Sequence, residues 1–187
     1  MIAITGHSRG LGKYLFNYFT ELGYLVQGYS KSNGYDLTSK EIRQKIIFEI
    51  DNCKIFINSA YDYNTHNNFQ THVLKEICQE WVAKPKYIFN IGSISSSIIS
   101  PVEGSVWGDS AYISNKLEQD YYCKRFCSIV REARLTNLRL GLIARIPARA
   151  NGSNDIPLLY IANTINNIIN DNTCTVTEIT IKPISKK

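Results

Sequence analysis

The sequence lacks the features of a membrane-spanning or secreted protein. No apolar run in the 187 residues approaches the roughly 18 that a membrane-spanning helix needs. The opening MIAITGHSRG does not have the basic and then apolar layout of a signal peptide. Only five cysteines are present, an odd and scattered set, which argues against a disulfide framework and for a reducing compartment. We therefore expect a cytoplasmic protein that does not bind membranes.

A large excess of charge of one sign is also missing. Lys and Arg number 21 and Asp and Glu 16, so the net charge of +5 is too small to predict nucleic-acid binding, although it is compatible with an anionic small ligand. Hydrophobic residues make up 44% and charged residues 20%, which is ordinary for a globular protein. No repeat, low-complexity tract or linker divides the chain. Residues 1–187 are therefore expected to form a single domain.

Short apolar runs alternate with amphipathic stretches along the whole chain. This alternation indicates a parallel sheet covered by helices on both faces, the doubly wound, Rossmann-like α/β class. Two irregular stretches, Ser95–Gly108 and Pro147–Asn154, follow strand ends, where such sheets bind ligands. The expected strands are Ile2–Thr5, Leu25–Tyr29, Gly34–Leu37, Lys54–Asn58, Lys86–Ile91, Leu138–Ile146 and Cys174–Ile181, and the expected helices are Leu11–Leu22, Ser39–Ile50, Phe69–Val82, Asp109–Arg134 and Asp155–Ile169.

Three glycines stand between the first expected strand and the first expected helix. Gly6 allows a sharp turn, Gly10 lets the backbone approach a pyrophosphate, and Gly12 lets the helix pack closely on the strand. The free N–H groups at the start of the helix then face the phosphate charge. A glycine triplet alone is weak evidence, but at the first strand–helix junction of a βαβ unit it is fairly specific. The expected dinucleotide contacts in this loop are Gly6, Ser8, Arg9, Gly10, Leu11 and Gly12.

The segment Thr5–Gly12 resembles the T-G-x-x-x-G-x-G segment of the compact members of the short-chain dehydrogenase/reductase family. The longer, epimerase-like branch of that family spaces its glycines as G-x-x-G-x-x-G. The resemblance extends from Thr5 to Ile143, and the chain is shorter than most of these relatives. It implies a Rossmann-like fold, a nicotinamide dinucleotide cofactor, and hydride transfer between the nicotinamide and a small carbonyl or alcohol substrate.

The end of the second expected strand bears on which dinucleotide is bound. An acid there would hydrogen-bond a ribose 2′-hydroxyl and repel a 2′-phosphate. This strand instead ends with Tyr29-Ser30-Lys31-Ser32. Lys31 and Arg9 can flank a 2′-phosphate, with Ser8 and Ser30 adding hydroxyls. We therefore expect NADP rather than NAD, the alternative being that both cations are solvated surface charges.

Two further segments match the family. Asp36-Leu37-Thr38 resembles its Asp-x-Thr/Ser segment, whose acid receives the adenine amino group. Asp36 is equally placed to cap the helix that is expected to begin near Ser39. Asn58-Ser59-Ala60 stands where the family has Asn-Ala-Gly. The resemblance implies that Asn58 braces the central sheet and that Ala60 leaves room for the adenine ribose.

A tyrosine and a lysine carry the expected chemistry. Tyr112 and Lys116 are four residues apart in an expected helix, which puts them on one face, one turn apart. A lysine ammonium beside a phenol favours the phenolate and lowers the tyrosine pKa from its reference value near 10, which suits proton transfer near neutral pH. With 12 tyrosines in the chain this spacing also arises by chance, so its weight comes from the other family segments.

Ser93 follows Asn90-Ile91-Gly92, like the catalytic serine in the N-x-S-S segment of the family. Further serines at 95–97 make the choice among serines less sharp, but the expected strand end favours Ser93. The resemblance implies that Ser93 hydrogen-bonds the substrate oxygen and that Tyr112 protonates it. It also implies that Lys116 holds the nicotinamide ribose hydroxyls.

The relay and the last cofactor contact depart from the family pattern. Many members use a helical asparagine in a proton relay, and here His72, Asn67 and Asn68 are the open alternatives. After the strand expected at Leu138–Ile146 the usual Pro-Gly is absent, and Arg145 stands at the threonine position. The backbone of Ile143 can still bind the carboxamide.

Other departures concern length. The stretch between Ser93 and Tyr112 is longer than the usual gap in the family, so an insertion must loop out within Ser95–Gly108. A full helix between the second and third expected strands is absent, and the substrate-covering segment Pro147–Asn154 is short. We therefore expect an open or shallow substrate site.

Two classes of function follow. The first is an NADP-dependent short-chain oxidoreductase, and the alternative is a non-catalytic dinucleotide-binding sensor or scaffold, which the departures favour but the retained Ser93, Tyr112 and Lys116 disfavour. The resemblance also implies a homodimer or homotetramer built on the two helices Phe69–Val82 and Asp109–Arg134. No metal site is expected, and the sequence does not identify the substrate or the physiological direction.

Overall fold

The computed structural model describes residues 1–62, 67–97, 110–129, 132–144 and 155–184. Within this part of the chain, six strands form one parallel sheet in the order β2-β1-β3-β4-β5-β6. The doubly wound, Rossmann-like fold expected from the sequence is confirmed. The strands are β1 (Ile2–Thr5), β2 (Val26–Tyr29), β3 (Ile55–Asn58), β4 (Tyr87–Ser93), β5 (Arg134–Leu140) and β6 (Glu178–Ile181).

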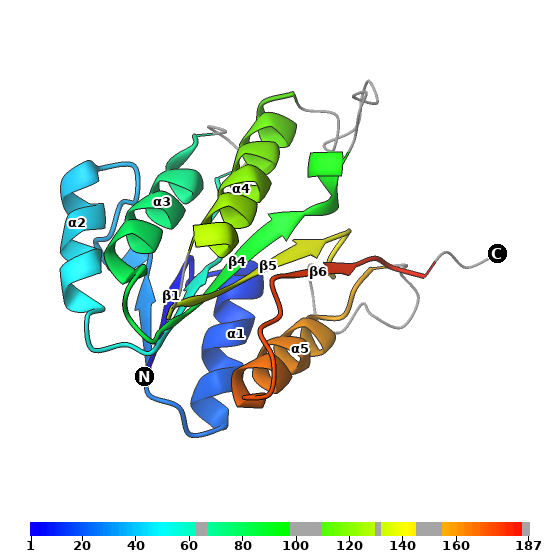
Figure 1. The fold of residues 1–187 in the computed structure, drawn as a ribbon, viewed down its shortest axis with the longest axis horizontal. Coiled ribbons are helices and arrows are strands. Elements are labelled where there is room, and N and C mark those ends of the chain that lie inside the picture. Colours follow the sequence, from blue (N-terminus) through cyan, green and yellow to red (C-terminus); the bar gives the residue numbers. More distant parts are fainter. Residues whose placement is uncertain (63–66, 98–109, 130–131, 145–154, 185–187) are drawn as a thin grey trace.

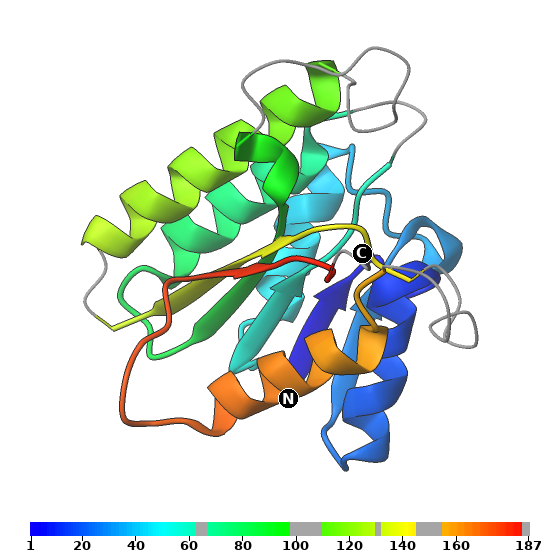
Figure 2. The same ribbon diagram turned by 90° about the vertical axis from the view of Figure 1, so that its right-hand side faces the viewer.

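Helices cover both faces of the sheet, as Figures 1 and 2 show. Two of them, α1 and α5, lie on one face, and α2, α3 and α4 lie on the other. Short 3-10 turns η1 (Lys31–Asn33) and η2 (Ile94–Ser97) follow β2 and β4. The helices are α1 (Gly10–Glu21), α2 (Lys40–Glu49), α3 (Phe69–Trp81), α4 (Ser110–Ile129) and α5 (Leu158–Asn170).

Two apolar layers flank the sheet because neighbouring residues of a strand point to opposite faces. Under α2, α3 and α4, the fully buried rings of Phe56 and Trp81 meet edge to face with their centres 6.2 Å apart. Under α1 and α5, Ile4, Phe19 and Ile161 are fully buried. The buried layers leave the carboxyl ends of the strands as the edge at which polar side chains gather.

The strand expected over Gly34–Leu37 does not form, so this prediction is wrong. Gly34 follows η1 with a φ of +88°, and Asp36 Oδ1 accepts a hydrogen bond of 3.0 Å from the Thr38 N–H. The chain therefore turns twice where an extended segment was expected. As a result β2 is the edge strand on this side of the sheet.

The boundary between α4 and β5 also differs from the prediction. The helix extends to Ile129 rather than to Arg134, and β5 occupies Arg134–Leu140 instead of beginning at Leu138. Two polar residues, Thr136 and Asn137, interrupt the apolar run that would predict a strand here, although both side chains are buried. At the C-terminus, α5 begins at Leu158 and β6 at Glu178, each slightly later than expected.

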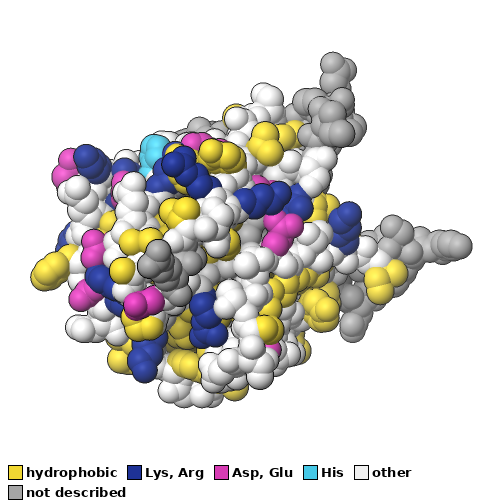
Figure 3. All heavy atoms as spheres, viewed as in Figure 1, with side chains coloured by type: hydrophobic (Ala, Val, Ile, Leu, Met, Phe, Trp, Pro, Cys, Tyr) yellow, Lys and Arg dark blue, Asp and Glu magenta, His cyan; other side chains and the backbone are white. Residues whose placement is uncertain are grey.

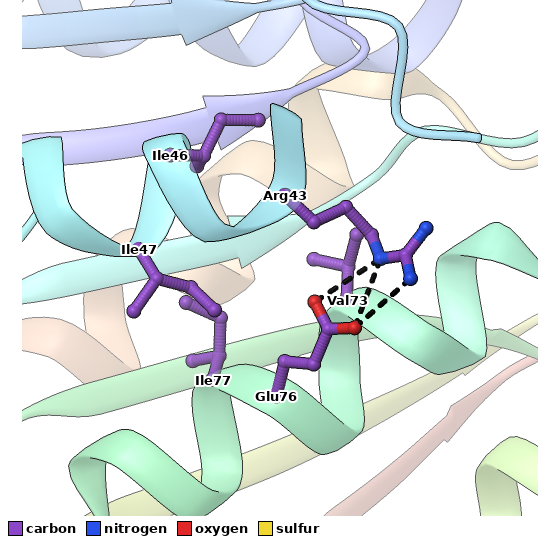
Figure 4. Close-up of a pocket in the computed structure, with 6 residues that line it drawn as sticks. All are labelled: Arg43, Ile46, Ile47, Val73, Glu76 and Ile77. Atoms are coloured by element: carbon purple, nitrogen blue, oxygen red, sulfur yellow. Dashed lines mark hydrogen bonds and ion pairs between the residues drawn. The ribbon is translucent and has the colours of Figure 1, made fainter. Parts of the chain in front are cut away.

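An ion pair in a tight apolar pocket joins α2 to α3 (Figure 4). Arg43 Nε donates to both carboxylate oxygens of Glu76 at 3.1 Å, and its Nη2 lies 3.0 Å from Glu76 Oε1. The remaining Nη1 donates to Leu37 O at 3.0 Å and to Thr38 O at 3.1 Å. Arg43 thereby holds the loop that precedes α2. The apolar side chains around the pair are Ile46, Ile47, Val73 and Ile77.

On the face shown in Figure 3, basic and acidic side chains are interspersed rather than gathered into one field. Among the described helices, none is both long enough and apolar enough to cross a bilayer.

Candidate active site

A cleft of about 930 Å³ lies at the carboxyl ends of the strands. The chain passes from β1 to β2 on one side and later to β3 on the other, so the cleft lies at the topological switch point where open α/β sheets bind ligands. Its volume is near the upper end of the range for small-molecule sites. The predicted site residues that line it are Gly6, Ser8, Arg9, Gly10, Leu11, Gly12, Ser30, Lys31, Asp36, Leu37, Ser59, Ala60, Tyr112, Lys116 and Ile143.

The glycine turn after β1 is packed against its neighbours on two sides. Gly6 has a φ of +74°, and a Cβ placed on it would lie 2.8 Å from Ala60 Cα. A Cβ on Gly12 would lie 2.3 Å from Gly6 O, so α1 packs directly behind the turn. A Cβ on Gly10 would meet no atom within 4 Å. The first turn of α1 therefore lines the cleft with N–H groups that have no partner within the helix.

The loop after β3 is fixed to β1 by one hydroxyl. Thr5 Oγ1 accepts hydrogen bonds from the N–H groups of Ser59 at 3.0 Å and Ala60 at 3.2 Å. Thr5 is completely buried, so these bonds are not exposed to competition from water. They hold the floor of the cleft beside the glycine turn.

The loop after β2 supplies a hydroxyl-rich and basic end of the cleft. The Oγ atoms of Ser30 and Ser32 are 2.8 Å apart, and Arg9, which lies within the glycine turn and lines the same cleft, is exposed. Lys31 Nζ lies 3.6 Å from Asp36 Oδ2, and both side chains are largely exposed. Lys31 is thus near a carboxylate of its own chain as well as near the cleft.

Asp36 does not cap α2, so that alternative is wrong. Ser39 is the cap, and its Oγ accepts a bond of 3.2 Å from Ile42 N. Burial tends to raise the pKa of Asp36, but the hydrogen bonds from Thr38 and the nearby Lys31 ammonium outweigh it and hold the pKa below its usual value. Asp36 is therefore an ionised acceptor in the cleft wall, next to Leu37.

Tyr112 and Lys116 lie together in the cleft, as their spacing predicts. Both are buried, at 5% and 3% exposure. Tyr61, from the loop after β3, completes the group, because its ring meets that of Tyr112 edge to face at 5.1 Å between centres. The Lys116 ammonium lies 4.9 Å from the centre of the Tyr61 ring and 5.7 Å from that of Tyr112.

The Lys116 ammonium donates to three neutral oxygens. These are Gln70 Oε1 at 2.7 Å, Ile91 O at 3.1 Å and Gln119 Oε1 at 3.3 Å. Burial lowers the pKa of Lys116 to about 7, while the Asp120 carboxylate acts in the opposite direction. The charge of this side chain therefore changes in the range of pH at which most enzymes work.

Gln70 is the residue of this site that sequence reasoning missed. It is the second residue of α3, and its Nε2 donates to Asn58 O at 3.0 Å and Ile91 O at 3.2 Å, which turns its Oε1 toward Lys116. Of the three relay alternatives, His72 and Asn67 are exposed and Asn68 donates to Glu118. The family pattern has an asparagine in this helix and so does not point to a glutamine, although the apolar spacing of α3 places Gln70 on its buried face.

A row of buried amides crosses the sheet beneath the cleft. Asn58, Asn90 and Asn137 are register partners on β3, β4 and β5. Asn58 Nδ2 donates to Asn90 Oδ1 at 3.1 Å, and Asn90 Nδ2 donates to Asn137 Oδ1 at 2.9 Å. Asn137 Nδ2 then donates to Asp120 Oδ1 on α4 at 2.7 Å. Asn58 thus braces the central sheet, as expected, and does so without lining the cleft.

Ser93 does not line the cleft in the described part of the chain. It ends β4 at 1% exposure, and its Oγ accepts a bond of 3.1 Å from Ser95 N. Its neighbour Gly92 does line the cleft. Arg145, with most of Ser95–Gly108 and all of Pro147–Asn154, lies outside the described residues.

The described residues fit a dinucleotide. The cleft extends from the loop after β2 to Lys116, across the start of α1. Gly10 leaves open space at the helix N-terminus, where a diphosphate is favoured. The basic and hydroxyl-bearing residues follow β2 at the edge of the sheet, whereas Tyr112 and Lys116 belong to α4, which packs on β4 and β5. The cleft therefore offers different chemistry at these two places.

The architecture is the Rossmann-like fold of solved dehydrogenase structures. One is a serine dehydrogenase complexed with NADP+ (TM-score 0.77, 14% identity, 100% of this chain and 96% of that chain). A second is an alcohol dehydrogenase from Thermococcus sibiricus complexed with 5-hydroxy-NADP (TM-score 0.76, 14% identity, 100% and 97%). A third is a short-chain dehydrogenase/reductase from Vibrio parahaemolyticus (TM-score 0.72, 18% identity, 99% and 100%). No protein-family model and no curated protein matches the sequence.

Proposed function

We propose that the chain is an NADP-dependent oxidoreductase of the short-chain dehydrogenase type, which interconverts a carbonyl compound and an alcohol. The observation that carries this proposal is the placement of Tyr112 and Lys116 in the same cleft as the glycine turn and the start of α1. Solved structures of the same fold include dehydrogenases complexed with NADP+ and with NADH. When bound, the dinucleotide would supply or accept the hydride.

The side chains of the cleft would handle the proton and the orientation of the substrate. Tyr112 would hold the transferred proton at its phenol oxygen, next to the substrate oxygen. Lys116 would hold the nicotinamide ribose hydroxyls by exchanging its longest bond, that to Gln119 Oε1. Ser93 is the proposed hydroxyl donor to the substrate oxygen, a role that requires its buried Oγ to become accessible from the cleft. The Ile143 backbone would bind the carboxamide.

The direct test is turnover by the purified protein. NADPH is mixed with a panel of aldehydes and ketones, and NADP+ with the corresponding alcohols, while the absorbance of the reduced nicotinamide is followed. Turnover of any member supports the proposal and shows the favoured direction. Binding of NADPH with no turnover across the panel would contradict it.

A second candidate function is that of a non-catalytic sensor or scaffold that binds the dinucleotide. One observation favours it: Ser93, a proposed catalytic residue, is buried and lies off the cleft wall. The retention of Tyr112 beside Lys116 argues for catalysis, because a binding protein does not need a phenol at that position.

We expect NADPH to bind more tightly than NADH, because Arg9 and Lys31 line the same cleft as the paired hydroxyls of Ser30 and Ser32. Loss of one charged contact to a 2′-phosphate costs about 1.5–3 kcal/mol, or roughly ten- to a hundredfold in Kd. Calorimetry should show this loss for Arg9→Ala with NADPH. The loss of NADPH affinity in Lys31→Ala should be at the lower end of this range, because Lys31 also pairs with Asp36.

The control for this prediction is Lys13→Ala, which removes an exposed ammonium from α1 outside the cleft lining. This variant should bind NADPH like the wild type. The affinity of Arg9→Ala for NADH should also stay unchanged, since NADH has no 2′-phosphate. Equal affinity of the wild type for NADPH and NADH would contradict the proposed cofactor preference.

We further propose a homodimer or homotetramer built on α3 and α4. In support, α4 exposes Leu117, Tyr121 and Ile129, at 55–61% exposure, although Phe126 is buried within the chain. Light scattering should give two or four times the 21.3 kDa of the chain, and a monomer at micromolar concentration would contradict the proposal.

We also propose a cytoplasmic location. The five cysteines are free thiols, which supports it.

A further inference from the structure

We propose that Asp120, which is ion-paired with Arg139, is a positioning residue of this site. It orients the row of buried amides and places a negative charge near Lys116. Asp120 is 5% exposed on α4 and follows Gln119, an acceptor of the Lys116 ammonium. Arg139 Nε lies 3.1 Å from Asp120 Oδ2, and Ser96 Oγ donates to the same oxygen. The importance of this arrangement for catalysis rests on the proposed function.

The direction of the amide row follows from the carboxylate. A carboxylate only accepts hydrogen bonds, so Asn137 must present its Nδ2 to Asp120 and its Oδ1 to Asn90. The same logic then turns Asn90 Oδ1 toward Asn58 Nδ2. The Asp120 carboxylate thus sets the orientation of three amides on three adjacent strands.

Two glutamines, Gln70 and Gln119, form hydrogen bonds both with Lys116 and with asparagines of the row. Gln119 Oε1 accepts from Lys116 at 3.3 Å and from Asn90 Nδ2 at 3.5 Å, and Gln119 Nε2 donates to Gln70 Oε1 at 3.1 Å. Gln70 Nε2 in turn donates to the backbone oxygen of Asn58. A reversal of the Asn90 amide would therefore place an oxygen against Gln119 Oε1, and a Gln119 turned to avoid it would present N–H groups where Lys116 needs an acceptor.

Among the described residues, few charged and titratable groups act on Lys116. The rings of Tyr61 and Tyr112 face it from the loop after β3 and from α4, and the buried Cys123 thiol and Asp120 lie on α4. On its α3 and β4 sides Lys116 meets the neutral oxygens of Gln70 and Ile91. Asp120 raises the pKa of Lys116 against the effect of burial. Arg139 Nε lies 3.1 Å from Asp120 Oδ2, so its positive charge would offset part of the effect of Asp120. The two charges should therefore act on Lys116 with opposite signs.

The test is the titration of Lys116 in the full-length, cofactor-free protein. Lysine labelled with 13C at Cε is incorporated, the Lys116 signal is assigned with Lys116→Arg, and its shift is followed by NMR from pH 5 to 10. The wild-type midpoint is expected at about 7. Asp120→Asn should lower it by about one pH unit, because the attractive charge is gone. Arg139→Gln should raise it, because the carboxylate is then no longer offset.

The matched control is Glu178→Gln. Glu178 Oε1 lies 3.4 Å from Arg139 Nη1, so this variant also removes a carboxylate from Arg139 but leaves Asp120 in place. Its Lys116 midpoint should stay at the wild-type value. An unmoved midpoint in folded Asp120→Asn, or shifts of Asp120→Asn and Arg139→Gln in the same direction, would overturn the proposal.

Folding and function are separated by two further measurements. Circular dichroism at each pH shows whether a variant is folded. If Asp120→Asn does not fold, the Lys116 midpoints of Arg139→Gln and Glu178→Gln are compared instead. A raised midpoint in Arg139→Gln alone supports the proposal, and an unchanged midpoint in Arg139→Gln overturns it. Because the titration needs neither cofactor nor turnover, its result stands apart from that of the activity test. In an active protein, the pH profile of kcat/KM should move with the lysine midpoint, whereas a purely structural defect would lower the rate equally at every pH.

Discussion

Replacing Tyr112 by Phe is expected to reduce turnover by about 10²–10⁴-fold, the usual contribution of a general acid. Only the hydroxyl is removed, and the ring remains buried against Tyr61. The fold and the affinity for NADPH should therefore stay close to those of the wild type. The measurements are the rate of NADPH consumption with the best substrate of the panel and the Kd of NADPH by calorimetry.

Two further variants serve as comparisons for Tyr112→Phe. Lys116→Met should weaken both turnover and NADPH binding, because Lys116 is proposed to contact the ribose as well as to face the Tyr112 phenol. Tyr121→Phe removes the hydroxyl of a 57% exposed tyrosine on the same helix and should leave both quantities unchanged. A Tyr112→Phe protein that works at the wild-type rate would contradict the proposed role of Tyr112 as the general acid.

A methyl group at Gly12 is expected to damage both the fold and dinucleotide binding. The Cβ of Gly12→Ala would lie 2.3 Å from Gly6 O, and the turn cannot retreat, because Gly6 is itself packed against Ala60 Cα. Overpacking of this kind costs about 3 kcal/mol of unfolding free energy. The shift of the glycine turn should also weaken NADPH binding by about tenfold or more. Urea unfolding and calorimetry measure the two effects.

The matched control is Gly10→Ala in the same turn. A Cβ at Gly10 meets no atom within 4 Å, so only its φ of +57° opposes the substitution. A left-handed residue with a side chain costs about 1 kcal/mol. Gly10→Ala should therefore be clearly more stable than Gly12→Ala. Equal stabilities of the two variants would show that the close approach of α1 to the turn is not what Gly12 provides.

The sequence predicted most elements of the fold because their apolar periodicity and glycines act locally. It failed at β5, where Thr136 and Asn137 interrupt the apolar pattern. Their burial depends on partners elsewhere in the chain: Tyr87 Oη for Thr136 and Asp120 for Asn137. No local pattern reports such distant partners, so the strand was placed too late.

In the candidate site, too, local patterns were predictable from the sequence and contacts between distant segments were not. The glycine turn and the Tyr112–Lys116 spacing are local patterns, and the structure brings both to one cleft. Gln70 and Tyr61 join the site only through the packing of α3 and of the loop after β3 against α4. The helical spacing of α3 places Gln70 on the buried face, but the contacts of Gln70 with Lys116 and of Tyr61 with Tyr112 depend on distances between segments far apart in the chain. No local spacing encodes those distances.

The row of asparagines bears on how the strands find their alignment during folding. The apolar residues alone would permit a slip, since β3 carries Ile55, Phe56 and Ile57 in succession, apolar on both faces. A slip by one residue would turn Asn58 toward the apolar layer of α1 and α5. A buried amide without a partner costs about 1–3 kcal/mol there. The asparagines thus select one alignment of the three central strands by making each misaligned sheet less stable than the correct one.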